Sequence, residues 1–161
     1  MRVRIGLWFL RLHQAIYQAT DGRAGHRLLG VPCLLLRTTG RRTGKPRTSA
    51  LVYAREGEEY LVVGSLGGAD RAPAWLYNVG ARPQVRVQVE RDRFHAVAEV
   101  IEPGDDAYER LWQLVNQENG GRYERYQART RRPIPVVRLT PQACPSPDWP
   151  VNRTTPTPRR T

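Results

Sequence analysis

The strongest local pattern in the chain lies in residues 33–54, which read CLLLRTTGRRTGKPRTSALVYA. The apolar run from Cys33 to Thr38 predicts a strand that is buried on both faces. Residues 40–46, with two glycines and a proline, predict a turn, and residues 48–54, with β-branched and aromatic side chains, predict a second strand. This stretch therefore predicts a strand–turn–strand unit whose turn is strongly basic.

The same kinds of pattern continue downstream. Further strands are predicted at residues 60–64, 84–89, 94–100 and 135–139. Two helices are predicted between these strands, at residues 73–79 and 105–118. About six short strands with inserted helices predict an α+β fold built on a small, mostly antiparallel β-barrel.

The chain divides into three predicted regions. Residues 1–29 are expected to form an N-terminal amphipathic helix, at residues 3–20, and a connector. Residues 30–141 are expected to form the barrel, and residues 142–161, which are rich in proline, a disordered tail. The helix either packs on its own domain or rests on an anionic membrane surface. No stretch of about 18 apolar residues is present, which excludes a transmembrane helix.

The composition limits the partners that the protein can have. The chain has 161 residues, 40% of them hydrophobic, and a formal net charge of +11. These values suit one globular domain with an anionic partner: a phosphorylated cofactor, nucleic acid or an acidic membrane. Two cysteines are too few for a disulfide framework or a zinc site, and no other metal site is expected. A reducing cytoplasm is the expected compartment.

The basic turn carries the first candidate chemistry. Its cationic side chains surround two glycines and the hydroxyls of Thr39 and Thr43; they are Arg41, Arg42, Lys45 and Arg47. Glycine lets a ligand approach the backbone, and arginine makes bidentate contacts with phosphate or carboxylate oxygens. Local chemistry alone is equally compatible with an anion site and with a solvated hairpin. A second candidate is the glycine-rich turn at residues 64–68, which leads toward a helix N-terminus.

Several motifs, in order and spacing, resemble those of the deazaflavin-dependent nitroreductase family. They are residues 34–47, Gly64-Ser65 with Gly67-Gly68, residues 73–78, residues 81–83 with the strand at 85–89, Tyr123 with Tyr126, and residues 134–137. The resemblance covers residues 30–140, and the agreement of several separate motifs makes it specific. It implies a split β-barrel that binds the reduced deazaflavin coenzyme F420. It also implies an oxidoreductase that transfers a hydride to quinones and, incidentally, to nitroaromatic compounds.

The resemblance also implies roles for individual residues. The four cations of the basic turn would meet the phosphate and the polyglutamate tail of the cofactor. The rest of the cofactor groove would be shaped by Thr39, Thr43, Gly44, Pro46, Gly67, Gly68, Trp75 and Asn78. Ser65 would lie beside the deazaflavin ring, while Tyr123 and Tyr126 would line the substrate side. A hydroxyl there can stabilise charge that develops on the acceptor oxygen, while the cofactor supplies the hydride chemistry.

Two positions depart from the pattern of the family. Leu66 stands where nitroimidazole-activating members carry a lysine, and Gly120 stands where they carry a third tyrosine. At Leu66 a charge near the cofactor is missing, or Arg71 replaces it, and at Gly120 the substrate wall is smaller and more flexible. Cofactor binding survives these changes better than the identity of the substrate does. Cofactor binding is therefore expected, and nitroimidazole activation is not.

Alternatives to this interpretation come from different classes of protein. The barrel could hold FMN in place of F420, because one fold hosts several cofactors. Nucleic-acid binding is not expected, because the basic residues cluster in one turn and aromatic side chains are sparse on the strands. Peripheral contact of residues 3–20 with the inner face of the cell membrane can coexist with quinone reduction. A homodimer is also left open.

Overall fold

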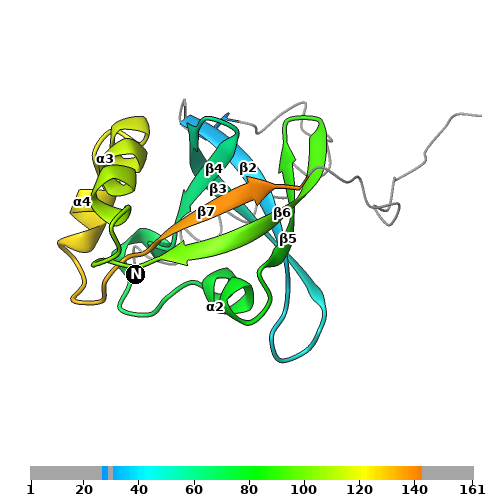
Figure 1. Cartoon of the computed structure of the whole chain (residues 1–161). Helices are drawn as coiled ribbons and strands as arrows, with labels where there is room; N and C mark the ends of the chain where they lie inside the picture. Colours follow the sequence, from blue (N-terminus) through cyan, green and yellow to red (C-terminus); the bar gives the residue numbers. More distant parts are fainter. Residues whose placement is uncertain (1–26, 29–30, 143–161) are drawn as a thin grey trace, which may run out of the picture.

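The computed structural model describes residues 27–28 and 31–142, which form strands and short helices (Figure 1). The strands are β1 (Arg27–Leu28), β2 (Val31–Thr39), β3 (Pro46–Glu56), β4 (Glu59–Val63), β5 (Gln84–Val89), β6 (Asp92–Ile101) and β7 (Val136–Pro141). The helical elements are the 3-10 turn η1 (Leu66–Gly68), α2 (Ala74–Ala81), α3 (Tyr108–Glu118) and α4 (Arg122–Gln127). Within the described part of the chain, no helix has the length and apolar character needed to cross a membrane.

Six strands close into an antiparallel barrel. Their order is β2–β3–β4–β7–β6–β5, and pairing of β5 with β2 closes the ring, while the short β1 pairs with the start of β2. Strand β2 is therefore hydrogen-bonded along both edges. Leu34 and Leu36 fill the barrel interior, whereas Cys33 and Leu35 are buried on the opposite face of the strand. The prediction of a strand buried on both faces is confirmed.

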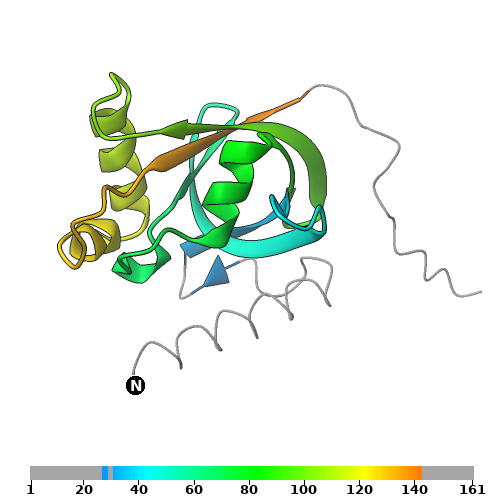
Figure 2. The ribbon, with the colours of Figure 1, turned by 90° about the horizontal axis from the view of Figure 1, so that it is seen from below.

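The barrel interior is filled by alternate residues of its strands. The fully enclosed members include Leu34, Leu36, Val62, Val87, Ala96, Val137 and Leu139. Helix α2 lies across one end of the barrel, where Trp75 and Val79 enter the same cluster (Figure 2). Because side chains alternate along a strand, the residues between these positions face outward. This alternation decides which residues of β2, β5 and β6 reach the outer surface.

A second hydrophobic layer packs outside the barrel. Helices α3 and α4 lie together against one side of the barrel (Figure 2), and Leu111 and Val115 of α3 pack on outward-facing residues such as Leu61 and Val136. The Tyr108 hydroxyl donates a hydrogen bond of 2.8 Å to the carbonyl of Ile134. The segment that precedes β7 is thereby fixed to α3, next to the turn at residues 64–68.

The predicted α+β barrel is confirmed, with shifts at the ends of several elements. Strand β5 matches its predicted range, and β2, β3 and β6 are longer than predicted because their hydrogen-bonded ladders continue past the apolar run. Helix α2 begins one residue after Pro73, which serves as its N-cap. Helix α3 begins at Tyr108 rather than at Asp105, because the Asp105 carboxylate accepts a hydrogen bond from the Glu102 N–H in a preceding turn.

Helix α4 is an element that the sequence interpretation missed. Gly120 and Gly121 adopt φ values of +60° and +69° and end α3, as predicted, but the chain then forms a second helix. The side-chain oxygen of Asn116 accepts a hydrogen bond of 3.0 Å from the Glu124 N–H, which joins the two helices. The helix predicted at residues 3–20 and the tail after residue 142 lie outside the described residues, so these assignments stay predictions.

Candidate functional site

The basic turn is a tight, exposed hairpin between β2 and β3. The Gly40 N–H donates to the Lys45 carbonyl and the Gly44 N–H donates to the Gly40 carbonyl, both at 2.8 Å. Gly44 has φ +67°, a conformation that glycine adopts without strain. Because residues 41–47 are all exposed, the turn presents its cationic side chains to solvent and not to the core.

Asn78 of α2 holds this turn in place through its side chain. Its side-chain amide donates a hydrogen bond of 3.0 Å to the Thr38 hydroxyl, and its carbonyl oxygen accepts one of 3.1 Å from the Arg41 N–H. Asn78 is only 6% exposed, so it positions the turn from within the protein. The Arg41 guanidinium then lies 4.7 Å from the centre of the Tyr77 ring, a cation–π contact on the exposed side of α2.

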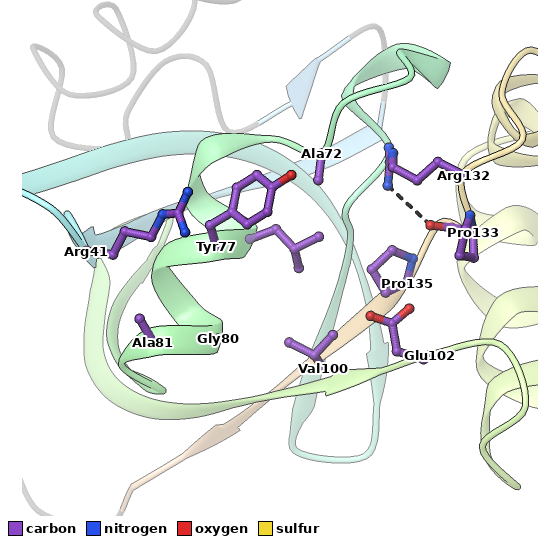
Figure 3. Close-up of a pocket in the computed structure, with 11 residues that line it drawn as sticks. Arg41, Ala72, Tyr77, Gly80, Ala81, Val100, Glu102, Arg132, Pro133 and Pro135 are labelled. Carbon is purple, nitrogen blue, oxygen red and sulfur yellow. Dashed lines mark hydrogen bonds between the residues drawn. The ribbon is translucent and has the colours of Figure 1, made fainter.

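A cavity of about 630 Å³ runs along α2 beside the basic turn (Figure 3). Its lining residues are Arg41, Ala72, Leu76, Tyr77, Gly80, Ala81, Val100, Glu102, Arg132, Pro133 and Pro135. Figure 3 shows Arg41 at one end, Tyr77 in the middle and Arg132 at the other end. The cavity is therefore a mostly apolar trough with a guanidinium at each end.

Arg132 anchors the far end of the cavity to the glycine-rich turn. Its guanidinium donates to the carbonyls of Gly64 and Ser65 at 3.1 and 3.2 Å, and more weakly to that of Ala69 at 3.4 Å. A further hydrogen bond of 3.3 Å reaches the carbonyl of Pro133. One side chain thereby holds both ends of the turn that contains Ser65.

Other polar contacts hold Arg132 itself in place. The Thr130 hydroxyl donates to the Asp70 carboxylate at 3.0 Å and accepts from the Arg132 N–H at 3.1 Å. The Gln127 side chain bonds to the backbone of Thr130, Arg132 and Ile134. Residues 127–134 are therefore a rigid strap across the turn at residues 64–70.

Gly68 brings that turn close to α4. A Cβ atom at this position would lie 2.5 Å from the Tyr126 carbonyl oxygen, and the backbone has φ +81°. The observed approach therefore requires glycine. Gly67, with φ +67°, has open space where a Cβ would lie, so its backbone conformation alone favours glycine.

The electrostatic character of the cavity is mixed at its Arg132 end. Glu102 lies beside Arg132, and partial burial together with the nearby Asp105 carboxylate raises the pKa of Glu102 above its ordinary value, although Arg132 opposes this. The Glu102 carboxyl is thus easier to protonate than an isolated glutamate. It is the acidic side chain that lines the cavity in the described part of the protein.

The structure brings only part of the predicted site together at this cavity. Arg41 lines the cavity directly. Ser65 is only 7% exposed, and its carbonyl accepts a hydrogen bond from Arg132, which does line the cavity. Asn78 contacts the basic turn and not the cavity. Trp75, 6% exposed, lies in the barrel core. The other cations of the turn, Arg42, Lys45 and Arg47, point to solvent beside the cavity.

The two tyrosines predicted for the substrate side differ in accessibility. Tyr123 is 6% exposed in the layer beneath α3 and α4, and burial raises the pKa of its hydroxyl well above the ordinary value. Tyr126 is half-buried and meets the Tyr123 ring edge-on, with ring centres 6.1 Å apart. Tyr126 is therefore the more exposed of the two residues.

Three cavity residues, Tyr77, Glu102 and Arg132, were missed by the sequence interpretation. Tyr77 lies inside a recognised motif, and its outward direction follows from α2 facing the barrel with Trp75 and Val79. Arg132 is one arginine among many, and its partners lie more than 60 residues away in the sequence. No local pattern in the sequence distinguishes it from its neighbours.

Comparisons with known proteins agree with the fold and with the motifs. A family model described as F420H(2)-dependent quinone reductase matches residues 8–141. An F420H(2)-dependent quinone reductase of Mycobacterium tuberculosis is 53% identical over 137 residues, which are 84% of this chain and 92% of the relative.

Solved structures extend this similarity to the fold. A structure of an F420-H2 dependent reductase is 34% identical with a TM-score of 0.60, and the match covers 67% of this chain and 93% of that one. A protein solved as a domain-swapped dimer is 30% identical with a TM-score of 0.63, over 83% and 98% of the two chains. From its sequence, and with a fold that agrees, the chain belongs to the F420H(2)-dependent quinone reductase family.

Proposed function

We propose that this F420H2-dependent oxidoreductase reduces a quinone-like acceptor in the cavity beside α2. Membership of the family gives coenzyme F420, and not FMN, as the cofactor. One observation carries the placement of the site: the cavity joins the basic turn at Arg41 to the braced turn of Ser65 at Arg132. An anionic group and a reacting ring can therefore be held by opposite ends of one trough.

The residues present fit such a cofactor. Known ligand cavities have volumes of roughly 300–1,000 Å³ and combine apolar walls with a few directed polar groups. The cavity here, at about 630 Å³, has an apolar middle formed by residues such as Leu76 and Val100 and a guanidinium at its Arg41 end. Gly80 adds free space in the wall, because a Cβ there would meet no atom within 4 Å.

We infer which residues would hold each part of the cofactor. Arg41, Arg42, Lys45 and Arg47 would bind the phosphate and the first carboxylates, since guanidinium and ammonium groups pair with such oxygens. The shape of the turn that faces the cofactor would be set by Thr39, Thr43, Gly44 and Pro46. Trp75 and Asn78 would fix the position of α2, and Gly67 and Gly68 would fix the position of η1.

The chemistry requires little from the protein beyond positioning. When bound, the reduced deazaflavin supplies a hydride to the acceptor. With the cofactor bound, the apolar walls of the cavity would keep water from the reacting groups, and α2 and the strap at residues 127–134 would hold the ring and the acceptor in one geometry. We infer that a hydroxyl of Ser65 or Tyr126, residues that do not themselves line the cavity, would donate a hydrogen bond to an acceptor oxygen as negative charge develops on it.

Tyr126 should matter more for turnover than Tyr123, because Tyr126 is the more exposed residue. We expect Tyr126→Phe to lower kcat for menadione by about tenfold, less than the roughly 100-fold or more that follows loss of a donor from a fully formed oxyanion hole, because Tyr126 is only half-buried. Tyr123→Phe should change kcat by less than about twofold and act mainly on stability. Steady-state kinetics at saturating cofactor, beside melting temperatures, separate the two effects. A larger fall in kcat for Tyr123→Phe would reverse this assignment.

The proposed function is tested by binding and by turnover. The purified protein should quench or shift the fluorescence of F420 on titration and should oxidise F420H2 when menadione is added. A parallel titration with FMN should show weaker binding. Absence of F420 binding at micromolar concentration would contradict the proposal.

The basic turn is tested in the same assays. Arg41→Ala combined with Lys45→Ala should raise the dissociation constant for F420 by about tenfold or more, because two charged contacts are lost, while kcat at saturating cofactor changes little. Arg91→Gln with Arg125→Gln removes the same charge from exposed positions away from the cavity and is the matched control. If the turn variant keeps wild-type affinity, the turn does not hold the cofactor.

Two further partners are proposed. A structural neighbour solved as a domain-swapped dimer supports a homodimer for this chain. Contact with a membrane surface was predicted for residues 3–20, which lie outside the described residues. The quinone class of acceptor fits such a contact, because quinones partition into membranes.

A further inference from the structure

Tyr77 is a large aromatic residue that the fold leaves at the surface, beside the cavity along α2. It is 45% exposed, and no other large hydrophobic residue in the described part of the chain is exposed. Helix α2 buries Trp75 and Val79 in the barrel core, which directs Tyr77 outward. A single exposed apolar residue is common on proteins, but this ring also lines the cavity. Its contacts there suggest a role.

The Tyr77 ring contacts the side chain of Arg41, which belongs to the basic turn. The guanidinium carbon lies 4.7 Å from the centre of the ring, within the range of a cation–π contact. Figure 3 shows the guanidinium of Arg41 directed toward the ring at one end of the cavity. Helix α2 thereby holds a side chain of the hairpin between β2 and β3.

This contact leaves the charge and the hydrogen-bond donors of Arg41 available. A guanidinium has five N–H donors, and an aromatic face attracts its charge without an oxygen acceptor. Among residues 27–28 and 31–142, no carboxylate pairs with Arg41 and no acceptor takes a hydrogen bond from its guanidinium. A carboxylate partner would hold the arginine but neutralise it. The ring holds it in a state that can bind an oxyanion.

Consecutive residues of α2 hold the two halves of Arg41. The side-chain carbonyl of Asn78 accepts a hydrogen bond of 3.1 Å from the Arg41 backbone N–H, while the Tyr77 ring contacts the guanidinium. Successive residues of a helix point about 100° apart, so Asn78 is buried and Tyr77 faces the cavity. The same helix supplies Leu76 and Gly80 to the cavity wall. Arg41 is therefore fixed relative to that wall.

We propose that Tyr77 is a positioning residue for Arg41, and that it increases the affinity of the cavity for a ligand with an oxyanion at this end. The proposal rests on the proposed function, in which the oxyanion is the phosphate or a carboxylate of F420. A free arginine side chain loses conformational entropy when it binds a ligand. A guanidinium that is already held over a ring loses less. Tyr77 thus acts on the cofactor through Arg41.

Tyr77→Leu tests this role, because it keeps an apolar side chain on α2 and removes the ring. In fluorescence titrations the dissociation constant for F420 should rise about two- to fivefold, the size expected for loss of an exposed cation–π contact. The value of kcat at saturating F420H2 should change little. Tyr77→Phe keeps the ring and should bind F420 as the wild type does. Melting temperatures verify that both variants are folded.

A double-mutant cycle tests whether Tyr77 acts through Arg41. In an Arg41→Ala background, Tyr77→Leu should leave the dissociation constant for F420 unchanged, because no guanidinium remains to be positioned. If Tyr77→Leu weakens binding equally with and without Arg41, the ring acts on the ligand directly and the positioning role is wrong.

Arg55→Ala is the matched control for the loss of a stacked arginine. The Arg55 guanidinium lies 4.8 Å from the centre of the Tyr60 ring, a similar contact, and Arg55 does not line the cavity. This variant should keep wild-type affinity for F420. A loss of affinity as large as that of Arg41→Ala would show that net charge, and not the Arg41–Tyr77 pair, controls binding.

NMR spectra of the protein without cofactor give a readout that does not depend on F420. The ring current of the aromatic residue should shift the side-chain proton resonances of Arg41 in the wild type and in Tyr77→Phe. The shift should disappear in Tyr77→Leu. Identical Arg41 resonances in the wild type and in Tyr77→Leu would show that the ring does not hold the guanidinium, and would overturn the proposal.

The same titrations separate this inference from the proposed function. If the wild type and Tyr77→Leu bind F420 equally well, the positioning role is wrong, although the cavity can still hold the cofactor. If the wild type does not bind F420, the proposed function fails and this inference fails with it. A rise in the dissociation constant for Tyr77→Leu that requires Arg41 supports both.

Discussion

Gly68→Ala is expected to lower the melting temperature by roughly 10 °C, which corresponds to about 2–4 kcal/mol of unfolding free energy. The new Cβ would lie 2.5 Å from the Tyr126 carbonyl oxygen and 3.0 Å from the Tyr126 Cα. Both are backbone atoms, so relief requires η1 or α4 to move as a unit. That movement shifts Ser65, and kcat/KM for the quinone should fall by about tenfold or more.

Gly67→Ala is the matched control for this substitution. Gly67 also has a positive φ, but a Cβ there would meet no atom within 4 Å. Only the cost of a left-handed backbone conformation for alanine remains, about 1 kcal/mol of unfolding free energy. The melting temperature should therefore fall by a few degrees, and kcat/KM should change little. Thermal unfolding and steady-state kinetics measure both outcomes. Equal effects of the two variants would show that the approach to α4 is not what requires glycine at residue 68.

Arg132→Met is expected to lower kcat/KM for the quinone by about 100-fold, because a loss of alignment of the reacting groups has effects of this size. The substitution keeps an apolar stem but removes the donors that hold the carbonyls of Gly64, Ser65 and Ala69. Stability should fall by about 2 kcal/mol, since several charged hydrogen bonds are lost from a half-buried site. Arg132 acts through the turn, so it is a positioning residue.

Three measurements separate positioning from a merely structural role. Kinetics well below the melting temperature of the variant should show that kcat falls more than KM rises. Added guanidinium ion should restore part of the activity of Arg132→Ala, because it can occupy the vacated site. Arg131→Met, at the exposed neighbouring position, should behave as wild type. A variant with low stability but unchanged kcat in the folded state would contradict a positioning role.

The barrel strands could be predicted because their signals are local. The apolar run Cys33–Leu36 and the alternation in residues 84–89 are properties of consecutive residues, and each was found as a strand. Helix α4 was missed because Gly120 and Gly121 end one helix without indicating another. Its start depends on the Asn116 side chain, which receives the Glu124 N–H from the next helix.

The candidate site was predictable only in part, for the same reason. Motif order identified the basic turn, and its anion-binding chemistry follows from residue type. Whether a side chain lines a cavity depends on how its helix packs. Trp75 lies in the core, whereas Tyr77, two residues later on the same helix, faces the cavity. Arg132 gains its role from carbonyls more than 60 positions away.

The strand and turn pattern, the basic turn and the family of the protein could be predicted from consecutive residues, because periodicity, turn chemistry and ordered motifs are local properties of the chain. The closure of the barrel through β2 and β5, the pairing of Arg37 with Arg86 on its outer face and the bracing of the Ser65 turn by Arg132 are visible in the three-dimensional structure alone. These features are contacts between distant segments. Their free energy depends on the three-dimensional arrangement of the strands, which no local stretch of residues specifies.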